Sequence, residues 1–87
     1  MAATVIYKYP LSLLAAATHN LPAGYQLRHV GHQDGEPMLW VEGDPSTISK
    51  PVTFAVLGTG KLIPGNWEWV GTYQEGPYVW HVFKVNE

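Results

Sequence analysis

Residues 25–42 read YQLRHVGHQDGEPMLWVE and contain the clearest folding signal of the chain. Apolar and aromatic residues stand on both sides of Asp34-Gly35. An Asp-Gly pair readily adopts the positive φ angles of a tight hairpin turn. The sequence therefore predicts two antiparallel strands, at residues 25–32 and 38–42, joined at this turn.

Glycine and proline punctuate the rest of the chain at short intervals, with β-branched and aromatic runs between them. Breaks every 8–12 residues are typical of an all-β sandwich or barrel. The segment 74–77, QEGP, predicts a second turn that pairs the last two strands. We predict an all-β fold, a small antiparallel sandwich or open barrel of about six or seven strands. The expected strands are residues 4–9, 15–20, 25–32, 38–42, 52–57, 67–73 and 78–85.

Length and composition limit the class of protein. Eighty-seven residues give room for one domain, residues 1–87. The absence of cysteine excludes disulfides and thiolate metal sites, which fits a reducing compartment such as bacterial cytoplasm. The Ala-rich segment 11–18 is expected to be a strand or an irregular lead-in, with a short helix as the alternative. It is too short to span a membrane, and with Pro10 at its edge it makes a poor secretory signal.

The charge pattern argues against binding to duplex nucleic acid. The formal net charge is −2, and the five basic residues are scattered along the sequence. A protein that neutralises several phosphates usually carries a clustered basic patch. A small nucleotide would need only a few cations, for which Lys61 and Arg28 are candidates.

Two motifs invite a chemical interpretation. His29 and His32, followed by Asp34 and Glu36, have the spacing of possible metal ligands. Two side chains that are three residues apart on a strand point to opposite faces, however. We therefore predict two ordinary strand histidines and no metal site. Gly58-Thr59-Gly60-Lys61 lacks the G-x-x-x-x-G-K-[ST] pattern of a P-loop. It remains a candidate anion-binding nest of backbone N–H groups beside a lysine, with a plain glycine turn as the alternative.

Aromatic stripes are the other candidate binding feature, because planar rings stack on nucleobases. Period-two alternation places Trp67, Trp69 and Tyr73 on one face of a strand, and Tyr78 with Trp80 on one face of the next. The alternative is core packing. Both faces of the last strand are apolar, so we expect it to be either central in the sheet or covered by a subunit or a ligand.

Catalytic signatures are missing from the sequence. The serines lack a nucleophile elbow, and no histidine stands in a recognisable triad pattern. We therefore expect a protein that is not an enzyme, with no catalytic residues and no cofactor.

Several short motifs together resemble a family of short uncharacterised proteins found mainly in bacteriophages and prophages. They are VIYKYPL (5–11), LPAG (21–24), GEPMLW (35–40), DP (44–45), GTG (58–60), VGTY (70–73) and VWHVF (79–83). The resemblance implies a phage accessory protein made in the cytoplasm of an infected bacterium, and it assigns no catalytic residues.

These observations lead to one functional hypothesis with two alternatives. We expect a self-associating, non-enzymatic protein that counters bacterial defence by sequestering a nucleotide-like immune signal. The first alternative is a protein–protein inhibitor of a host defence factor such as a nuclease complex, and the second is a small virion or assembly component. The predicted ligand-binding residues are Gly58, Thr59, Gly60 and Lys61 for phosphate and Trp67, Trp69 and Trp80 for bases.

Overall fold

A computed structural model describes residues 3–86 and shows an all-β fold, as predicted. All seven expected strands are present, with ends shifted by a few residues. They are β1 (Val5–Pro10), β2 (Ala17–Pro22), β3 (Gln26–Gln33), β4 (Glu36–Gly43), β5 (Ser49–Gly58), β6 (Glu68–Glu75) and β7 (Tyr78–Lys84).

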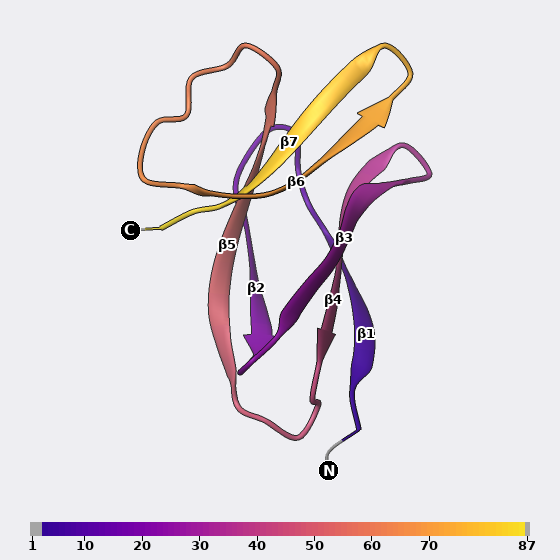
Figure 1. Ribbon diagram of the computed structural model, residues 1–87, viewed down its shortest axis with the longest axis vertical. Coiled ribbons are helices and arrows are strands. Elements are labelled where there is room, and N and C mark those ends of the chain that lie inside the picture. Colours follow the sequence, from indigo (N-terminus) through magenta and orange to yellow (C-terminus); the bar gives the residue numbers. More distant parts are fainter. Residues whose placement is uncertain (1–2, 87) are drawn as a thin grey trace.

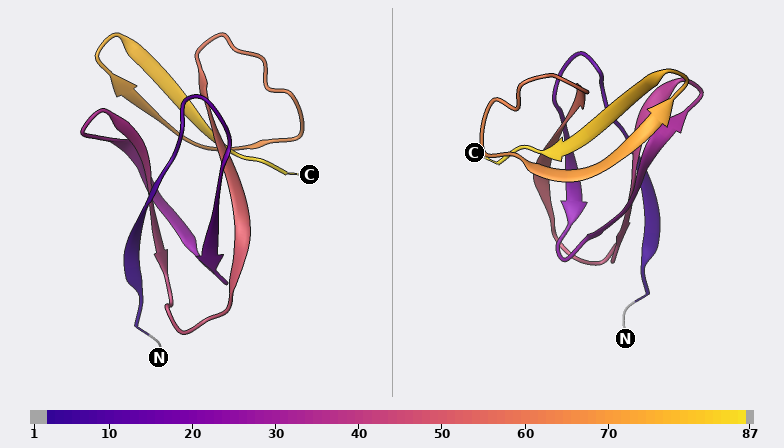
Figure 2. Two further views of the ribbon diagram at one scale, coloured as in Figure 1. Left: turned by 180° about the vertical axis from the view of Figure 1, so that it is seen from behind. Right: turned by 45° about the horizontal axis from the view of Figure 1, so that its top comes forward.

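The strands form two antiparallel sheets that do not close into a barrel (Figures 1 and 2). One sheet has the order β1-β4-β3 and the other the order β2-β5-β7-β6. Both predicted hairpins are confirmed, since β3 pairs with β4 and β6 with β7. Asp34 and Gly35 have φ angles of 53° and 80°, as a hairpin turn of this type requires.

The hydrophobic core fills the space between the two sheets. Along β4, buried positions alternate with more exposed ones, as expected of a strand with one face on the core. The side chains that are almost fully buried come from β2, β4, β5 and β7, so both sheets contribute to one core. They are Phe54, Leu21, Leu39, Val41 and Val82.

The two sheets approach each other most closely where β3 meets β6. A Cβ atom on Gly71 would lie 2.6 Å from Cγ2 of Val30, so only glycine allows this approach without a shift. Both strands carry an irregularity at this level, between Leu27 and His29 in β3 and between Trp69 and Gly71 in β6. Bulges of this kind increase the local twist and thereby bring the two sheet edges together.

The bulge in β6 makes one prediction wrong, namely which side chains of this strand share a face. Trp69 lies opposite Phe83, whereas Tyr73 lies opposite Trp80, and these two partners point to opposite faces of β7. Trp69 is accordingly 60% exposed on the outer face, while Tyr73 is 8% exposed in the core. The expected stripe of Trp67, Trp69 and Tyr73 is wrong because the bulge adds a residue to the strand and reverses the alternation.

The outer face of β7 is covered by the chain itself. Strand β7 is central in its sheet, between β5 and β6. Phe83 and Ala55 point outward from the core, yet each is only 7% exposed, and Phe83 contacts the ring of Trp67, with 6.2 Å between the ring centroids. The apolar pattern of β7 predicted that the strand is either central in its sheet or covered on its second face. The strand is central, and the connection between β5 and β6 also covers its outer face.

The connection between β1 and β2 is irregular and not helical. Residues 11–16 form no helix, and the Ser12 hydroxyl accepts hydrogen bonds from the N–H groups of Leu14 and Ala15. None of residues 3–86 lies in a helix that is long and apolar enough to cross a bilayer.

Candidate functional site

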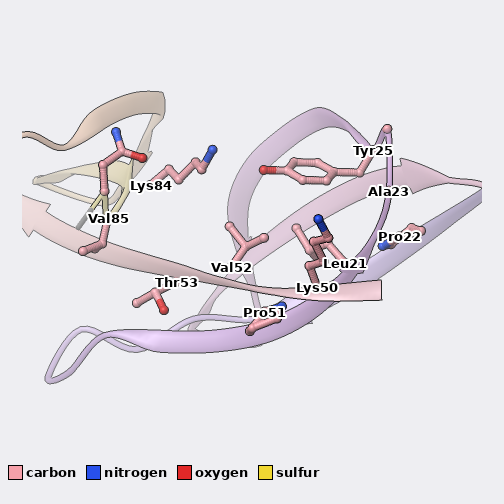
Figure 3. Close-up of a pocket in the computed structure, with 12 residues that line it drawn as sticks. Leu21, Pro22, Ala23, Tyr25, Lys50, Pro51, Val52, Thr53, Lys84 and Val85 are labelled. Atoms are coloured by element: carbon pink, nitrogen blue, oxygen red, sulfur yellow. The ribbon is translucent and has the colours of Figure 1, made fainter. Parts of the chain in front are cut away.

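A cavity of about 660 Å³ opens on the inner face of the β2-β5-β7-β6 sheet, beside the core (Figure 3). Three segments line it: residues 21–25, 50–53 and 84–86. We call it the lysine pocket, because Lys50 and Lys84 are its charged lining side chains. Figure 3 shows the Lys84 ammonium and the Tyr25 hydroxyl pointing toward each other above Val52.

Turn chemistry positions the walls of the lysine pocket. After β2 ends, Gly24 adopts a φ of 76°, and the N–H of Tyr25 donates to the carbonyl of Pro22 at 3.2 Å. This turn projects the half-buried Tyr25 ring over β5. On the other side, the N–H of Val85 donates to the carbonyl of Thr53 at 2.8 Å and fixes the segment after β7 to β5.

The lysine pocket contains two positive charges although the protein carries a net charge of −2. Within residues 3–86, none of its lining residues is acidic and neither lysine forms an ion pair. Glu68 lies opposite Lys84 across the β6–β7 pairing but does not line the pocket.

Arg28, the other cation considered from the sequence, is engaged elsewhere. Its Nε donates to Oε1 of Glu42 at 2.8 Å on the outer face of the other sheet. Hydrogen bonds from Thr4 and then Arg28 lower the pKa of Glu42 below its usual value, so this carboxylate stays charged beside the arginine.

The predicted glycine motif forms a separate and smaller cavity, on the opposite face of the same sheet. This cavity of about 230 Å³ is lined by residues 57–61 together with Ile63, His81 and Phe83. The N–H of Lys61 donates to the carbonyl of Gly58 at 3.2 Å, and Gly60 has a φ of 91°. The motif is therefore a glycine turn closed by its own hydrogen bond, so that the Lys61 amide is already engaged within the chain.

A hydrogen-bonded chain of side chains connects this turn to β6 and β7. Thr59 Oγ1 lies 2.8 Å from His81 Nε2, and His81 Nδ1 lies 3.0 Å from Thr72 Oγ1. Trp69 Nε1 donates to the same Thr72 hydroxyl at 3.1 Å. This His81 network fastens the start of the β5–β6 connection to the outer face of the sheet.

The structure separates the three tryptophans that were predicted to stack on a base. Trp67 and Trp69 belong to the outer face, whereas Trp80 lies opposite Gly58 on the inner face and packs against the core. A Cβ atom on Gly58 would lie 3.3 Å from the Trp80 ring. No single ligand can therefore contact all three indoles and the glycine turn in the way the sequence suggested.

The two histidines of the candidate metal motif contact aromatic rings in different places. His29 packs against Trp40, with ring centroids 5.3 Å apart, and His32 packs against Tyr73 at 5.9 Å. Within residues 3–86, no three histidine, aspartate or glutamate side chains gather as metal ligands would.

Sequence reasoning missed the lysine pocket because its residues are far apart in the chain. Tyr25, Lys50 and Lys84 belong to no common motif, and only strand pairing together with the turn after β2 brings them together. The only available signal was indirect: Leu21-Pro22-Ala23-Gly24 predicts a turn before an aromatic residue.

The fold and its cavities define a small two-sheet antiparallel β-sandwich with a lysine-lined pocket beside its core. The chain belongs to the family described as Domain of unknown function (DUF7352), whose model matches residues 2–87. No curated protein and no solved structure shows significant similarity to it.

Proposed function

We propose that this protein is a non-enzymatic binder of a small, anionic, nucleotide-like ligand, and that the lysine pocket is its binding site. The observation that carries the proposal is the placement of two lysines, neither of them in an ion pair within residues 3–86, in a cavity of about 660 Å³. The assignment moves the phosphate contacts from Lys61 to Lys50 and Lys84, and the stacking ring from tryptophan to Tyr25.

The dimensions and chemistry of the pocket support a ligand of this class. Small-molecule sites usually enclose about 300–1,000 Å³ and combine apolar walls with a few polar groups. Leu21 and Val52 supply apolar surface, Tyr25 supplies a ring for stacking, and the two ammonium groups favour an anion.

The phage resemblance suggests the biological setting of the proposal. A protein that sequesters a nucleotide immune signal would act in the cytoplasm of the infected bacterium, where such signals are made. Binding alone would then be sufficient, and no catalytic group is required. Self-association would place several copies of the pocket in one particle and enclose more apolar surface than one small chain can.

A second candidate function is inhibition of a host protein by direct contact. The β5–β6 connection exposes large apolar side chains, Leu62 at 89% and Ile63 at 51%, and Trp69 is exposed on the strand that follows. Interfaces favour tryptophan anchors, so this surface favours a protein partner.

Native mass spectrometry of the purified protein with a panel of linear and cyclic nucleotides tests the proposal. We expect one panel member to add its mass to the protein, and a Lys50→Gln, Lys84→Gln double variant to lose that adduct. A Lys61→Gln variant is the matched control and should retain it. If no panel member binds, nucleotide sequestration is wrong and capture of a host protein becomes the leading explanation.

A further inference from the structure

The two lysines enter the pocket at opposite ends of it. Lys84 lies opposite Phe54, which is four residues after Lys50 on β5. Because a strand rises about 3.3 Å per residue, the two backbones are about 13 Å apart along β5. Alternation places Lys50, Val52 and Phe54 on one face of β5, and Lys84 shares that face through its pairing.

Apolar surface separates the two charges. Val52 lies between the lysines in Figure 3, and the Tyr25 ring lies over the same stretch of β5. An ammonium on a four-carbon stem reaches inward from either end, but two lysines so far apart cannot both contact one compact anion without extending toward the middle. The pocket thus has a cation at each end and an apolar, aromatic centre.

We propose that the ligand carries two anionic groups, one on either side of a nucleoside whose base packs on the Tyr25 ring, and that Lys50 and Lys84 each bind one of them. This inference rests on the proposed function and specifies its ligand class as bis-anionic and elongated. A ligand with a single phosphate would use one lysine and leave the other in water. A ligand with both charges would use the two lysines and the Tyr25 ring together.

Three adenosine nucleotides that share one base provide the test: adenosine 3′,5′-bisphosphate, adenosine 5′-monophosphate and adenosine 3′-monophosphate. Their affinities for the full chain are measured by isothermal titration calorimetry, and amide chemical shifts locate the binding. We expect the bisphosphate to bind about two- to fivefold more tightly than either monophosphate, the gain expected of one additional, partly solvated ion pair.

Single substitutions then assign the two ends. Lys50→Gln and Lys84→Gln should each reduce bisphosphate affinity to the level of a monophosphate, and each should spare one of the two monophosphates. Lys61→Gln, on the opposite face of the sheet, is the control and should change nothing. Both lysine side chains reach solvent, and an unchanged amide spectrum checks that each variant is folded.

The outcomes separate this inference from the proposal on which it rests. If the bisphosphate and the better monophosphate bind equally, and one lysine substitution has no effect, the two-ended site is wrong while nucleotide binding in the pocket stands. If shifts occur at Thr59 and His81 and not at Tyr25 and Val52, the pocket assignment is wrong. If none of the three nucleotides binds, both the inference and nucleotide binding fail.

Discussion

The two faces of the β2-β5-β7-β6 sheet differ in whether their polar side chains have partners within the protein. On the outer face, the hydroxyls of Thr59 and Thr72 and the ring of His81 are hydrogen-bonded to one another, beneath a connection that covers Phe83. On the inner face, Lys50 and Lys84 line a larger cavity without an acidic partner among its walls. Groups that satisfy each other stabilise a fold, whereas unpaired charges around a cavity are available to a ligand.

This contrast separates a structural region from a binding region, although sequence alone favoured the reverse. The Gly58–Lys61 motif stood out because its residues are adjacent in the chain, and adjacency is what a turn needs. The lysine pocket is assembled by the pairing of β5 with β2 and β7. If the contrast holds, substitutions in the outer-face network change stability without changing binding, and substitutions of the two pocket lysines change binding without changing stability.

Among substitutions on the outer face, the largest effect is expected from Phe83→Ala. Phe83 is 7% exposed and packs against Trp67, so its truncation leaves a void under the β5–β6 connection. We expect the free energy of unfolding, measured in urea, to fall by about 3 kcal/mol. Phe54→Ala, in the core on the inner face, is the control and should cost about 4 kcal/mol. A loss below about 1 kcal/mol for Phe83→Ala would mean that the connection does not form a packed cover.

A smaller effect is expected from the His81 network. His81→Ala removes both hydrogen bonds to threonine hydroxyls, which can then bind water because they are exposed. We expect a loss of about 1 kcal/mol in the free energy of unfolding. In a double-mutant cycle, His81→Ala and Thr59→Val should couple by about 0.5 kcal/mol or more, whereas His81→Ala and the distant Thr18→Val should be additive. Additivity in both pairs would show that the network contributes nothing to stability.

For Tyr73 we expect a substitution to maintain or raise the free energy of unfolding, in contrast to the substitutions above. Its hydroxyl is buried without a hydrogen-bond partner within residues 3–86, and burial raises its pKa to about 12. Tyr73→Phe removes an unsatisfied polar group, so we expect stability to be unchanged or to rise by up to about 1 kcal/mol at neutral pH. Tyr78→Phe, on an exposed side chain, is the control and should have no effect.

The same tyrosine predicts a pH dependence. Because the folded-state pKa lies above the unfolded value of about 10, the folded protein favours the neutral phenol. The resulting stability is complete below pH 10 and is lost as the pH rises toward 12. Unfolding free energies measured across this range should fall more steeply for the native chain than for Tyr73→Phe. Parallel curves would contradict the assignment of a buried, neutral Tyr73.

The number of the strands and their positions along the chain were predictable from the sequence, because turn residues and period-two alternation are local signals. The Asp34-Gly35 hairpin shows this most clearly. The faces of β6 were not predictable, since a bulge between Trp69 and Gly71 depends on the fit of Gly71 against Val30 in the other sheet. The lysine pocket was unpredictable for the same reason: the sequence identifies the strands but not which ones become neighbours.

The smallest effect on stability, and the clearest separation of the two faces, is expected from Lys50→Gln and Lys84→Gln. The backbones of the two lysines are about 13 Å apart along β5 and both side chains reach solvent, so at 0.1 M salt, where the Debye length is about 10 Å, removing one charge relieves little mutual repulsion. Lys84→Gln also removes a cross-strand neighbour of Glu68, which accounts for a loss of about 0.3 kcal/mol in the free energy of unfolding. Glu68→Gln should reproduce that loss, and Lys50→Gln should leave stability unchanged. Nucleotide affinity should instead fall in both lysine variants and stay unchanged in His81→Ala. If the lysine variants lose stability in the same measure as they lose affinity, the pocket is part of the scaffold, and the division between a structural His81 network and a binding lysine pocket is wrong.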